Sequence, residues 1–171
     1  MSIADQASSR IDVEPPHEPA AGRHRIEVEV PVAADAAAAF QAITDWAGQG
    51  RWMVGTRVWA SRGSGHRVGD ELSGWTGIGR LGFVDTMTIT DYTDQWVLVE
   101  HTGRVVRGIG WMGVPRGGVQ TRFVWGEDVE LPLGLLGRIG WLAVRPMLHA
   151  GVKHSLRRLA ALVETGEMPS R

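Results

Sequence analysis

The stretch LGLLGRIGWLAVRPMLHAGVKHSLRRLAALVE, residues 133–164, decides the fold, because it is the longest part of the chain with a helical repeat of apolar residues. Pro146 removes a hydrogen bond to the turn before it, so we expect one long helix that is kinked there. We expect the part after Pro146 to pack as core, and residues 133–145 to line or gate a pocket. The positions that set the repeat are Leu135, Ile139 and Leu142, then Leu148, Val152, Leu156, Leu159 and Val163.

The same helix is too polar to cross a membrane. A membrane span needs about 20 mostly apolar residues. The most apolar window, residues 131–152, contains two prolines, two arginines and His149. We therefore expect no transmembrane segment.

The region before this helix has the pattern of an antiparallel sheet. Short alternating or β-branched runs follow one another and are separated by Gly, Asp and Pro. This spacing predicts a meander of strands rather than strands joined by helices. We place these strands near residues 54–60, 69–77, 82–91, 95–102, 104–112 and 119–131.

The N-terminal part of the chain supplies one more strand and two short helices. Residues 24–32 alternate between apolar and charged side chains, as a half-buried strand does. Residues 35–43 are rich in helix formers, and a second short helix begins at Thr44 or Asp45 before Gly48 and Gly50 interrupt it.

Together these elements predict an α+β fold. We expect a curved antiparallel sheet of about seven strands, two short helices and one long C-terminal helix. Residues 23–166 form the domain, residues 1–22 a disordered N-terminal tail rich in Ala, Ser, Glu and Pro, and residues 167–171 a C-terminal tail.

The composition excludes several classes of function. The chain has 171 residues, 43% hydrophobic residues and eight Trp, which fits a single folded domain. The formal net charge is −1 and Lys153 is the only lysine, so we expect no nucleic-acid partner. The absence of Cys excludes thiolate metal sites and disulfides, and without an apolar leader we expect a cytoplasmic protein.

Two glycine-rich segments match the dinucleotide-binding pattern GxGxxG, at residues 77–82 and 108–113. That pattern binds pyrophosphate only where a helix follows it, and here a strand follows the first match and a Pro-containing loop the second. We interpret these glycines as points where a sheet bends, which gives the sheet a concave face.

Three ionisable residues lie on otherwise apolar strand faces: Asp85, His101 and Glu127. If the three faces meet, these side chains are candidate catalytic groups that polarise a carbonyl or move a proton. The alternative is that they lie near strand ends and pair with arginines across the sheet. We expect no metal site, because His149 and His154 lie five positions apart on a helix and point away from each other.

The candidate wall of a ligand pocket is apolar and comes from the strands and the first half of the long helix. Its members are Trp75, Phe83, Met87, Val99, Gly108, Gly110, Met112, Phe123, Trp125, Ile139 and Leu142. Trp125 is the preferred pocket aromatic.

The chain resembles a known superfamily over about residues 24–165. The segments that carry the resemblance are VPVAAD at 30–35, TDW at 44–46, Trp52, DTM at 85–87, HTGRVVRG at 101–108 and LPLG at 131–134. They are similar to the Bet v 1/START-like (SRPBCC) superfamily, in particular its bacterial polyketide cyclase/dehydrase-like members. The resemblance implies a helix-grip fold whose cavity takes lipids, polyketides or quinones, with no obligatory cofactor. The family's aromatase/cyclases hold substrate with Arg, Tyr and Trp, whereas Tyr92, the only Tyr here, falls in an expected turn at residues 90–94.

These observations leave three hypotheses for function. The first is binding of a small hydrophobic molecule between the sheet and the C-terminal helix. The second is a cyclase or dehydratase type of enzyme that uses Asp85, His101 or Glu127 as acid or base in the same cavity. The third is a transient contact of the exposed rim, including residues 134–141, with a membrane surface or another protein. The identity of the ligand and the oligomeric state stay open at this level.

Overall fold

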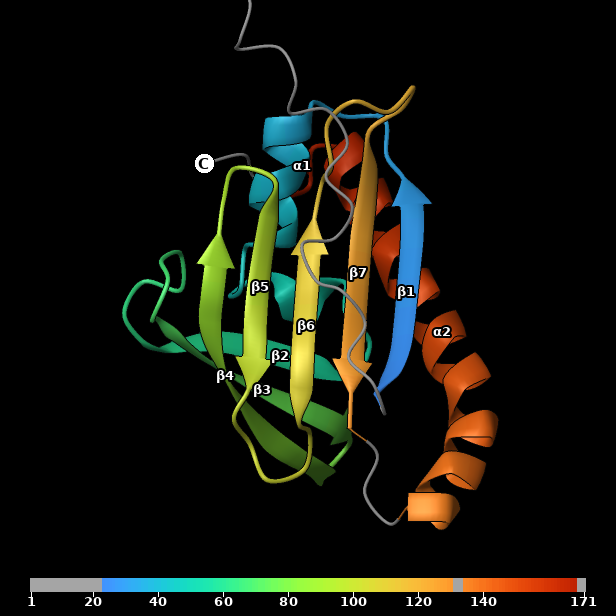
Figure 1. Ribbon diagram of the computed structural model, residues 1–171. Coiled ribbons are helices and arrows are strands. Elements are labelled where there is room, and N and C mark those ends of the chain that lie inside the picture. The colour runs from blue at the N-terminus through green and yellow to red at the C-terminus, as the bar shows by residue number, and fades with distance from the viewer. Residues whose placement is uncertain (1–22, 131–133, 169–171) are drawn as a thin grey trace, which may run out of the picture.

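The computed structural model describes residues 23–130 and 134–168, and within its last helix the side chains from Gly140 onward. The elements in chain order are β1 (His24–Pro31), α1 (Ala36–Ile43), the 3₁₀ turn η2 (Gln49–Arg51), β2 (Thr56–Arg62), β3 (Glu71–Ile78), β4 (Leu81–Tyr92), β5 (Trp96–His101), β6 (Gly108–Gly113), β7 (Arg122–Val129) and α2 (Gly134–Glu164). Figure 1 shows a sheet whose strands turn through a wide angle from β1 to β2, with the helices behind it.

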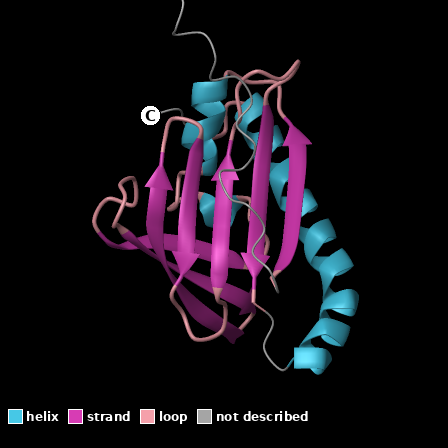
Figure 2. Ribbon diagram, in the orientation of Figure 1, coloured by secondary structure: helices cyan, strands magenta, loops and turns pink. Residues whose placement is uncertain are grey.

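The seven strands form one sheet in the order β1-β7-β6-β5-β4-β3-β2. Every neighbouring pair is antiparallel, and only the pairing of the first strand with the last requires a long connection. Figure 2 shows α1 and α2 on the same side of this sheet. The expected α+β arrangement, with a curved antiparallel sheet and a long C-terminal helix, is confirmed.

One face of the sheet packs against the helices and is called the inner face here. Alternate residues of β1, Ile26, Val28 and Val30, are buried in one cluster with Phe123 and Trp125 of β7. The same cluster contains residues of both helices, among them Phe40, Ile43, Leu156 and Leu159. Because strand side chains alternate, this alignment fixes which residues of the other strands share the inner face.

The helix α2 differs sharply between its two halves. After Pro146 it buries Val152, Leu156 and Leu159, as expected for core. Before Pro146, and in the first turn after it, large apolar side chains of α2 are exposed: Leu142 is 75% and Met147 is 71% accessible. This part is attached to the domain by Trp141 and Leu148, which pack against the main core, and the ring of Trp141 lies 5.9 Å from the ring of His24 at the start of β1. The helix itself continues through Pro146.

The structure also corrects several expected boundaries. The second short helix is only the turn η2, because Gly48 and Gly50 favour an irregular backbone. The strand β6 begins at Gly108 rather than near residue 104, because residues 102–107 form the connection from β5. Tyr92 is not in a turn: β4 continues through it, and its ring meets Phe40 of α1 at 5.9 Å.

The face of the sheet opposite the helices carries a smaller apolar cluster. It consists of Trp96, Leu98, Trp111 and Val124. The indole N–H of Trp111 donates to Glu27 Oε2 at 3.0 Å, and the guanidinium of Arg25 lies 4.6 Å from the Trp111 ring. Trp59 pairs with Ser73 and Trp75 pairs with Val84, and these positions face the same side as this smaller cluster. Four of the eight Trp residues, Trp59, Trp75, Trp96 and Trp111, therefore lie on the face opposite the helices.

Within the described residues, no helix is long and apolar enough to cross a membrane. The expected tail at residues 1–22, the segment 131–133 and residues 169–171 lie outside the part of the chain that the structure describes.

Candidate functional site

The register of four strands brings Asp85, His101 and Glu127 to the same region of the inner face. Met87 pairs with His101, so Asp85 lies two residues further toward the end of the sheet on the same face. Glu127 pairs with Ile26, a core residue, and therefore also points inward. The three groups come from β4, β5 and β7, which explains why no local sequence motif unites them.

The three side chains form a chain centred on the imidazole. His101 Nδ1 lies 2.5 Å from Asp85 Oδ2, and His101 Nε2 lies 3.8 Å from Glu127 Oε1. The side chain of His101 is 5% exposed, that of Asp85 8% and that of Glu127 23%. The first contact is a buried, charge-assisted hydrogen bond, whereas the second is an electrostatic contact that is too long to be a hydrogen bond.

Two glycines make this arrangement possible. β6 lies between β5 and β7, and a Cβ on its Gly110 would lie 3.1 Å from His101 Nε2 and 3.8 Å from Glu127 Cγ. The imidazole thus reaches toward Glu127 over a residue without a side chain. In the connection after β5, a Cβ on Gly103 would lie 2.1 Å from Asp85 Oδ1, closer than atoms approach. Gly103 is required there so that backbone can cover the carboxylate.

The electrostatics of the cluster favour a charged imidazole. Burial by itself disfavours the imidazolium, but the hydrogen bond to Asp85 and the negative charges of Glu127 and Asp85 outweigh it, so the pKa of His101 is raised. Burial raises the pKa of Glu127 as well; the charge of His101 opposes that effect and the charge of Asp85 adds to it. The rise in the pKa of His101 therefore comes from the two carboxylates, whereas that of Glu127 comes mainly from burial.

Two atoms of the cluster have no hydrogen-bond partner among the described residues. These are Asp85 Oδ1 and His101 Nε2, and both are buried. A buried polar atom without a partner costs about 1–3 kcal/mol. The backbone at Gly103 covers Asp85 Oδ1, so His101 Nε2 is the candidate contact point for a ligand oxygen. Because Nδ1 faces Asp85, the other nitrogen donates when the ring is charged and accepts when it is neutral.

A second pair of unpartnered polar atoms belongs to η2 and the residue after it. The buried Gln49 Oε1 and Trp52 Nε1 have no partner among the described residues. Gln49 Nε2 lies 3.8 Å from the sulfur of Met112. Gly108 of β6 pairs with His101, and Met112 is four residues further along the same strand. Met112 is therefore about 13 Å along β6 from the level of His101. Sequence reasoning missed Gln49, whose only signal is a polar residue between two glycines.

Most of the expected wall residues share the inner face with this cluster. Val99 and Met112 pack with the core of the sheet, Met87 lies opposite His101, and Phe123 and Trp125 belong to the main core. The inner-face positions among the expected wall residues are Phe83, Met87, Val99, Gly108, Gly110, Met112, Phe123 and Trp125.

Three expected wall residues do not join this group. Trp75 pairs with Val84 and so points to the opposite face from Asp85, where Arg57 lies 5.7 Å from its ring. Leu142 is directed to solvent, because the inward stripe of α2 runs through Trp141 and Leu148 instead. The side chain of Ile139 lies outside the described residues, although its backbone is helical.

The expected arginine partners of the three ionisable groups are also absent from the cluster: within the described residues, the partner of Asp85 and Glu127 is His101. No group of three or more His, Cys, Asp or Glu in the described part of the chain is arranged to hold a metal ion. The short contact of Nδ1 with Asp85 and the unpartnered Nε2 suit the cluster to hydrogen bonding and proton transfer.

Comparison with known proteins supports the fold described above. The sequence pattern of a family described as polyketide cyclase/dehydrase and lipid transport matches residues 23–164. No curated protein sequence matches the chain.

Solved structures with the same fold have low sequence identity to the chain. The ZhuI aromatase/cyclase of Streptomyces sp. R1128 has a TM-score of 0.68 at 12% identity, over 86% of this chain and 97% of its own. Protein TTHA0849 of Thermus thermophilus has a TM-score of 0.66 at 14% identity, over 84% and 99%. The major latex-like protein 151 of Panax ginseng has a TM-score of 0.53 at 10% identity, over 78% and 98%. At this identity the likeness establishes the fold alone.

Proposed function

Because the chain belongs to the polyketide cyclase/dehydrase and lipid transport family, we propose that it binds a small hydrophobic molecule of the lipid, polyketide or quinone class. The ligand lies between the inner face of the sheet and α2, and an oxygen atom of the ligand contacts His101 Nε2. The observation that carries this proposal is the buried, unpartnered Nε2 of His101, which shares its sheet face with the apolar side chains of Met87, Val99 and Met112.

The surroundings of His101 support this orientation of the ligand. Met87, Val99 and Met112 provide apolar contact area beside the imidazole. Asp85 fixes the ring through Nδ1 and leaves the other nitrogen free to bond a carbonyl or hydroxyl group. A few placed polar groups within an apolar lining are the usual composition of small-molecule sites.

The unpartnered atoms of Gln49 and Trp52 support a ligand with a second polar group. Gln49 lies near Met112, about 13 Å along β6 from the level of His101, and Trp52 follows it three residues later in the chain. A molecule with oxygen atoms at both ends would satisfy both sets of buried atoms.

Calorimetric titration with naphthalene and 2-naphthol tests the proposed function, because the two probes differ by one hydroxyl group. We expect both to bind, and 2-naphthol to bind about tenfold more tightly, as a hydrogen bond to a charged group provides. In His101→Leu the preference should disappear while naphthalene still binds. The matched control His149→Leu, at an exposed position of α2, should keep the preference. Failure of both probes to bind would contradict the proposal.

A second candidate function, acid–base catalysis, is favoured by the raised pKa values of His101 and Glu127. In the loss of water from a β-hydroxy ketone, Glu127 would take the proton from the carbon next to the carbonyl. Protonated His101 would give its proton to the hydroxyl oxygen, the C–O bond would break, and water would leave. The neutral imidazole then regains a proton from Glu127, 3.8 Å away, and Asp85 acts as the positioning residue.

This second candidate can be tested with 4-hydroxy-4-phenyl-2-butanone, whose dehydration gives a conjugated enone that absorbs in the ultraviolet. We expect His101→Gln to lower the rate about 100-fold, and Asp85→Asn to lower it while shifting the upper limb of the pH profile. The rate should fall as pH rises through the His101 pKa, because the acid is lost, and as pH falls through the Glu127 pKa. No enone formation above the buffer rate would leave binding as the function.

A further inference from the structure

One end of the molecule collects several chain segments that are far apart in sequence. The antiparallel register places the β3–β4 hairpin, the connection from β5 to β6 and the start of β1 at the same end of the sheet. α2 begins there too, since it follows β7, and Trp141 touches His24 at that end. Figure 1 shows these segments at the lower end of the view. We call the surface formed by residues 78–84, 102–107 and 140–148 the hairpin end.

The hairpin end exposes large apolar side chains. Ile78 is 87% and Leu81 84% accessible, at the tip of the β3–β4 hairpin. Val105 of the neighbouring connection and Leu142 and Met147 of α2 are exposed as well. Single exposed apolar residues are common, but Ile78, Leu81 and Val105 lie on neighbouring loops at one end of the sheet, which indicates a surface that contacts something.

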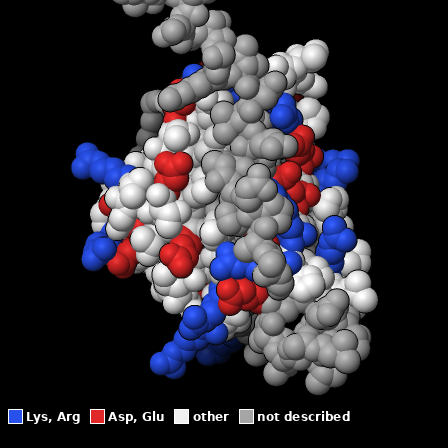
Figure 3. Space-filling model, viewed as in Figure 1, with Lys and Arg blue, Asp and Glu red and all other residues white. Residues whose placement is uncertain are grey.

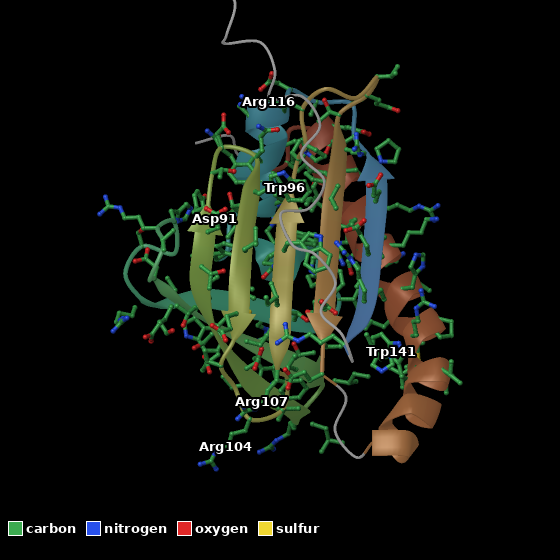
Figure 4. All side chains as sticks on the ribbon, viewed as in Figure 1. Asp91, Trp96, Arg104, Arg107, Arg116 and Trp141 are labelled. Atoms are coloured by element: carbon green, nitrogen blue, oxygen red, sulfur yellow. The ribbon has the colours of Figure 1, made fainter. Side chains whose placement is uncertain are left out.

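The charge of the hairpin end has one sign. Its exposed charged residues are Arg80, Arg104, Arg107 and Arg145, and the ranges that define it contain no Asp or Glu. In the described part of the chain none of these arginines has an ion-pair partner; Glu130, which is close by, pairs with Arg23. Figure 4 shows Arg104 and Arg107 at this end and Arg116 at the other. In Figure 3 blue atoms project at the lower left of the visible face.

The helix α2, which begins at this end, also carries an excess of positive charge. From Gly140 to Val163, α2 contains Arg145, Lys153, Arg157 and Arg158 but no acidic residue. The opposite end is different, because its arginine Arg116 pairs with Asp94 at 2.8 Å. The chain as a whole has a net charge of −1, so the positive charge of the hairpin end reflects a local arrangement and not the composition.

We propose that the hairpin end docks on a membrane surface that contains anionic lipids. Aliphatic side chains that alternate with arginines suit the boundary between lipid headgroups and acyl chains: Ile78, Leu81 and Val105 enter it, and the guanidinium groups bind phosphates. A second copy of the chain fits poorly, since a symmetric dimer through this surface would bring unpaired arginines together. This contact goes beyond the proposed ligand binding and requires no ligand.

The cluster of Asp85, His101 and Glu127 lies close to the proposed membrane-binding end. Asp85 lies near the start of β4 and His101 at the end of β5, both toward the hairpin end. A docked protein would therefore present the polar part of its candidate ligand site to the membrane side. An apolar ligand would pass between membrane and protein without crossing water.

The experiment is flotation of the full-length protein with vesicles of phosphatidylcholine alone or of phosphatidylcholine mixed with phosphatidylglycerol. We expect binding to the mixed vesicles only, and weaker binding as salt increases. The double variant Arg80→Gln/Leu81→Ser should lose about tenfold in vesicle affinity. The matched control, Arg67→Gln/Val68→Ser, changes an exposed Arg and an exposed apolar neighbour in the β2–β3 connection at the far end and should bind as the unmodified protein does.

Three outcomes would overturn the proposal: no binding to the mixed vesicles, equal binding to both vesicle types, or the same loss in both double variants. Circular dichroism checks that each variant is folded. Sedimentation velocity tests the alternative occupant, because a dimer that Arg80→Gln/Leu81→Ser dissociates would show that a second copy covers this surface. The naphthalene titration is made without vesicles, so failure of docking and failure of ligand binding are distinguishable.

Discussion

His101 and Asp85 are joined by a hydrogen bond between β5 and β4, with Nδ1 2.5 Å from Oδ2 and both side chains buried. The two residues are not direct cross-strand partners, because His101 pairs with Met87. The imidazole therefore lies diagonally over the inner face, and its other nitrogen is directed toward Glu127. This pair fixes the protonation chemistry of the site, and the first prediction follows from it.

Stability should depend on pH through His101. Its pKa is raised in the folded protein above the ordinary value of 6.5, so the charged ring stabilises the fold below that value and the contribution is lost as pH rises through the folded pKa. Urea unfolding from mildly acidic to mildly alkaline pH should show this decrease in the free energy of unfolding. Asp85→Asn should flatten it, whereas His154→Asn, at an exposed helix position, should not. An unchanged slope in Asp85→Asn would contradict the pairing.

Gly103 should not tolerate a side chain. A Cβ there would meet Asp85 Oδ1 at 2.1 Å, so Gly103→Ala must displace the carboxylate or the connection, and we expect a loss of about 1–3 kcal/mol in the free energy of unfolding. Gly151 is the matched control: it is in α2 with open space where a Cβ would lie. Gly151→Ala should stabilise the protein by up to about 1 kcal/mol. Opposite signs in urea titrations are the expected result, and a neutral Gly103→Ala would show that the backbone does not cover the carboxylate as described.

The two halves of α2 should respond differently to truncation. Leu156 is fully buried in the main core, and Leu156→Ala should cost about 2–5 kcal/mol. Leu142 is directed to solvent, and Leu142→Ala should change the free energy of unfolding by less than about 0.5 kcal/mol. Thermal or urea unfolding measures both. A large loss in Leu142→Ala would mean that the first half of the helix packs on the domain.

Two tryptophans test which face of the sheet binds the ligand. Trp125 shares the inner face with Met112, whereas Trp75 lies on the opposite face beside Arg57. Trp125→Phe keeps an aromatic ring in the core and should weaken naphthalene binding severalfold. Trp75→Phe should leave the affinity unchanged. Equal effects of the two substitutions in titration calorimetry would contradict the assignment of the inner face.

Much of the architecture could be predicted from local patterns. The alternation of apolar and charged residues at 24–32 and the helical repeat after Pro146 each reflect which side chains are buried, and both elements formed as expected. Strand parity also placed Asp85, His101 and Glu127 on apolar faces, although parity within single strands does not say which faces meet. That information lies in the register, which depends on the turns that join the strands.

The same limitation explains the residues that were misplaced. Whether Trp75 shares a sheet face with Asp85 depends on how the turn between β3 and β4 aligns the two strands. The alternation of residues within β3 alone does not determine that alignment. Leu142 matches a helical repeat, but the stripe that reaches the domain runs back from Val152 through Leu148 to Trp141. Gln49 and Gly103 act through contacts with strands distant in sequence, so no pattern near them could reveal those contacts.

Native mass spectrometry of the protein, purified without detergent from its host, tests the central claim most directly, because it detects a bound small molecule whatever its identity. We predict an excess mass of one small, largely apolar compound that is released on denaturation and is absent from preparations of His101→Leu/Trp125→Ala that remain folded by circular dichroism. A mass equal to that of the bare chain, both as purified and after incubation with naphthalene or 2-naphthol, would contradict the claim that the inner face binds a hydrophobic ligand.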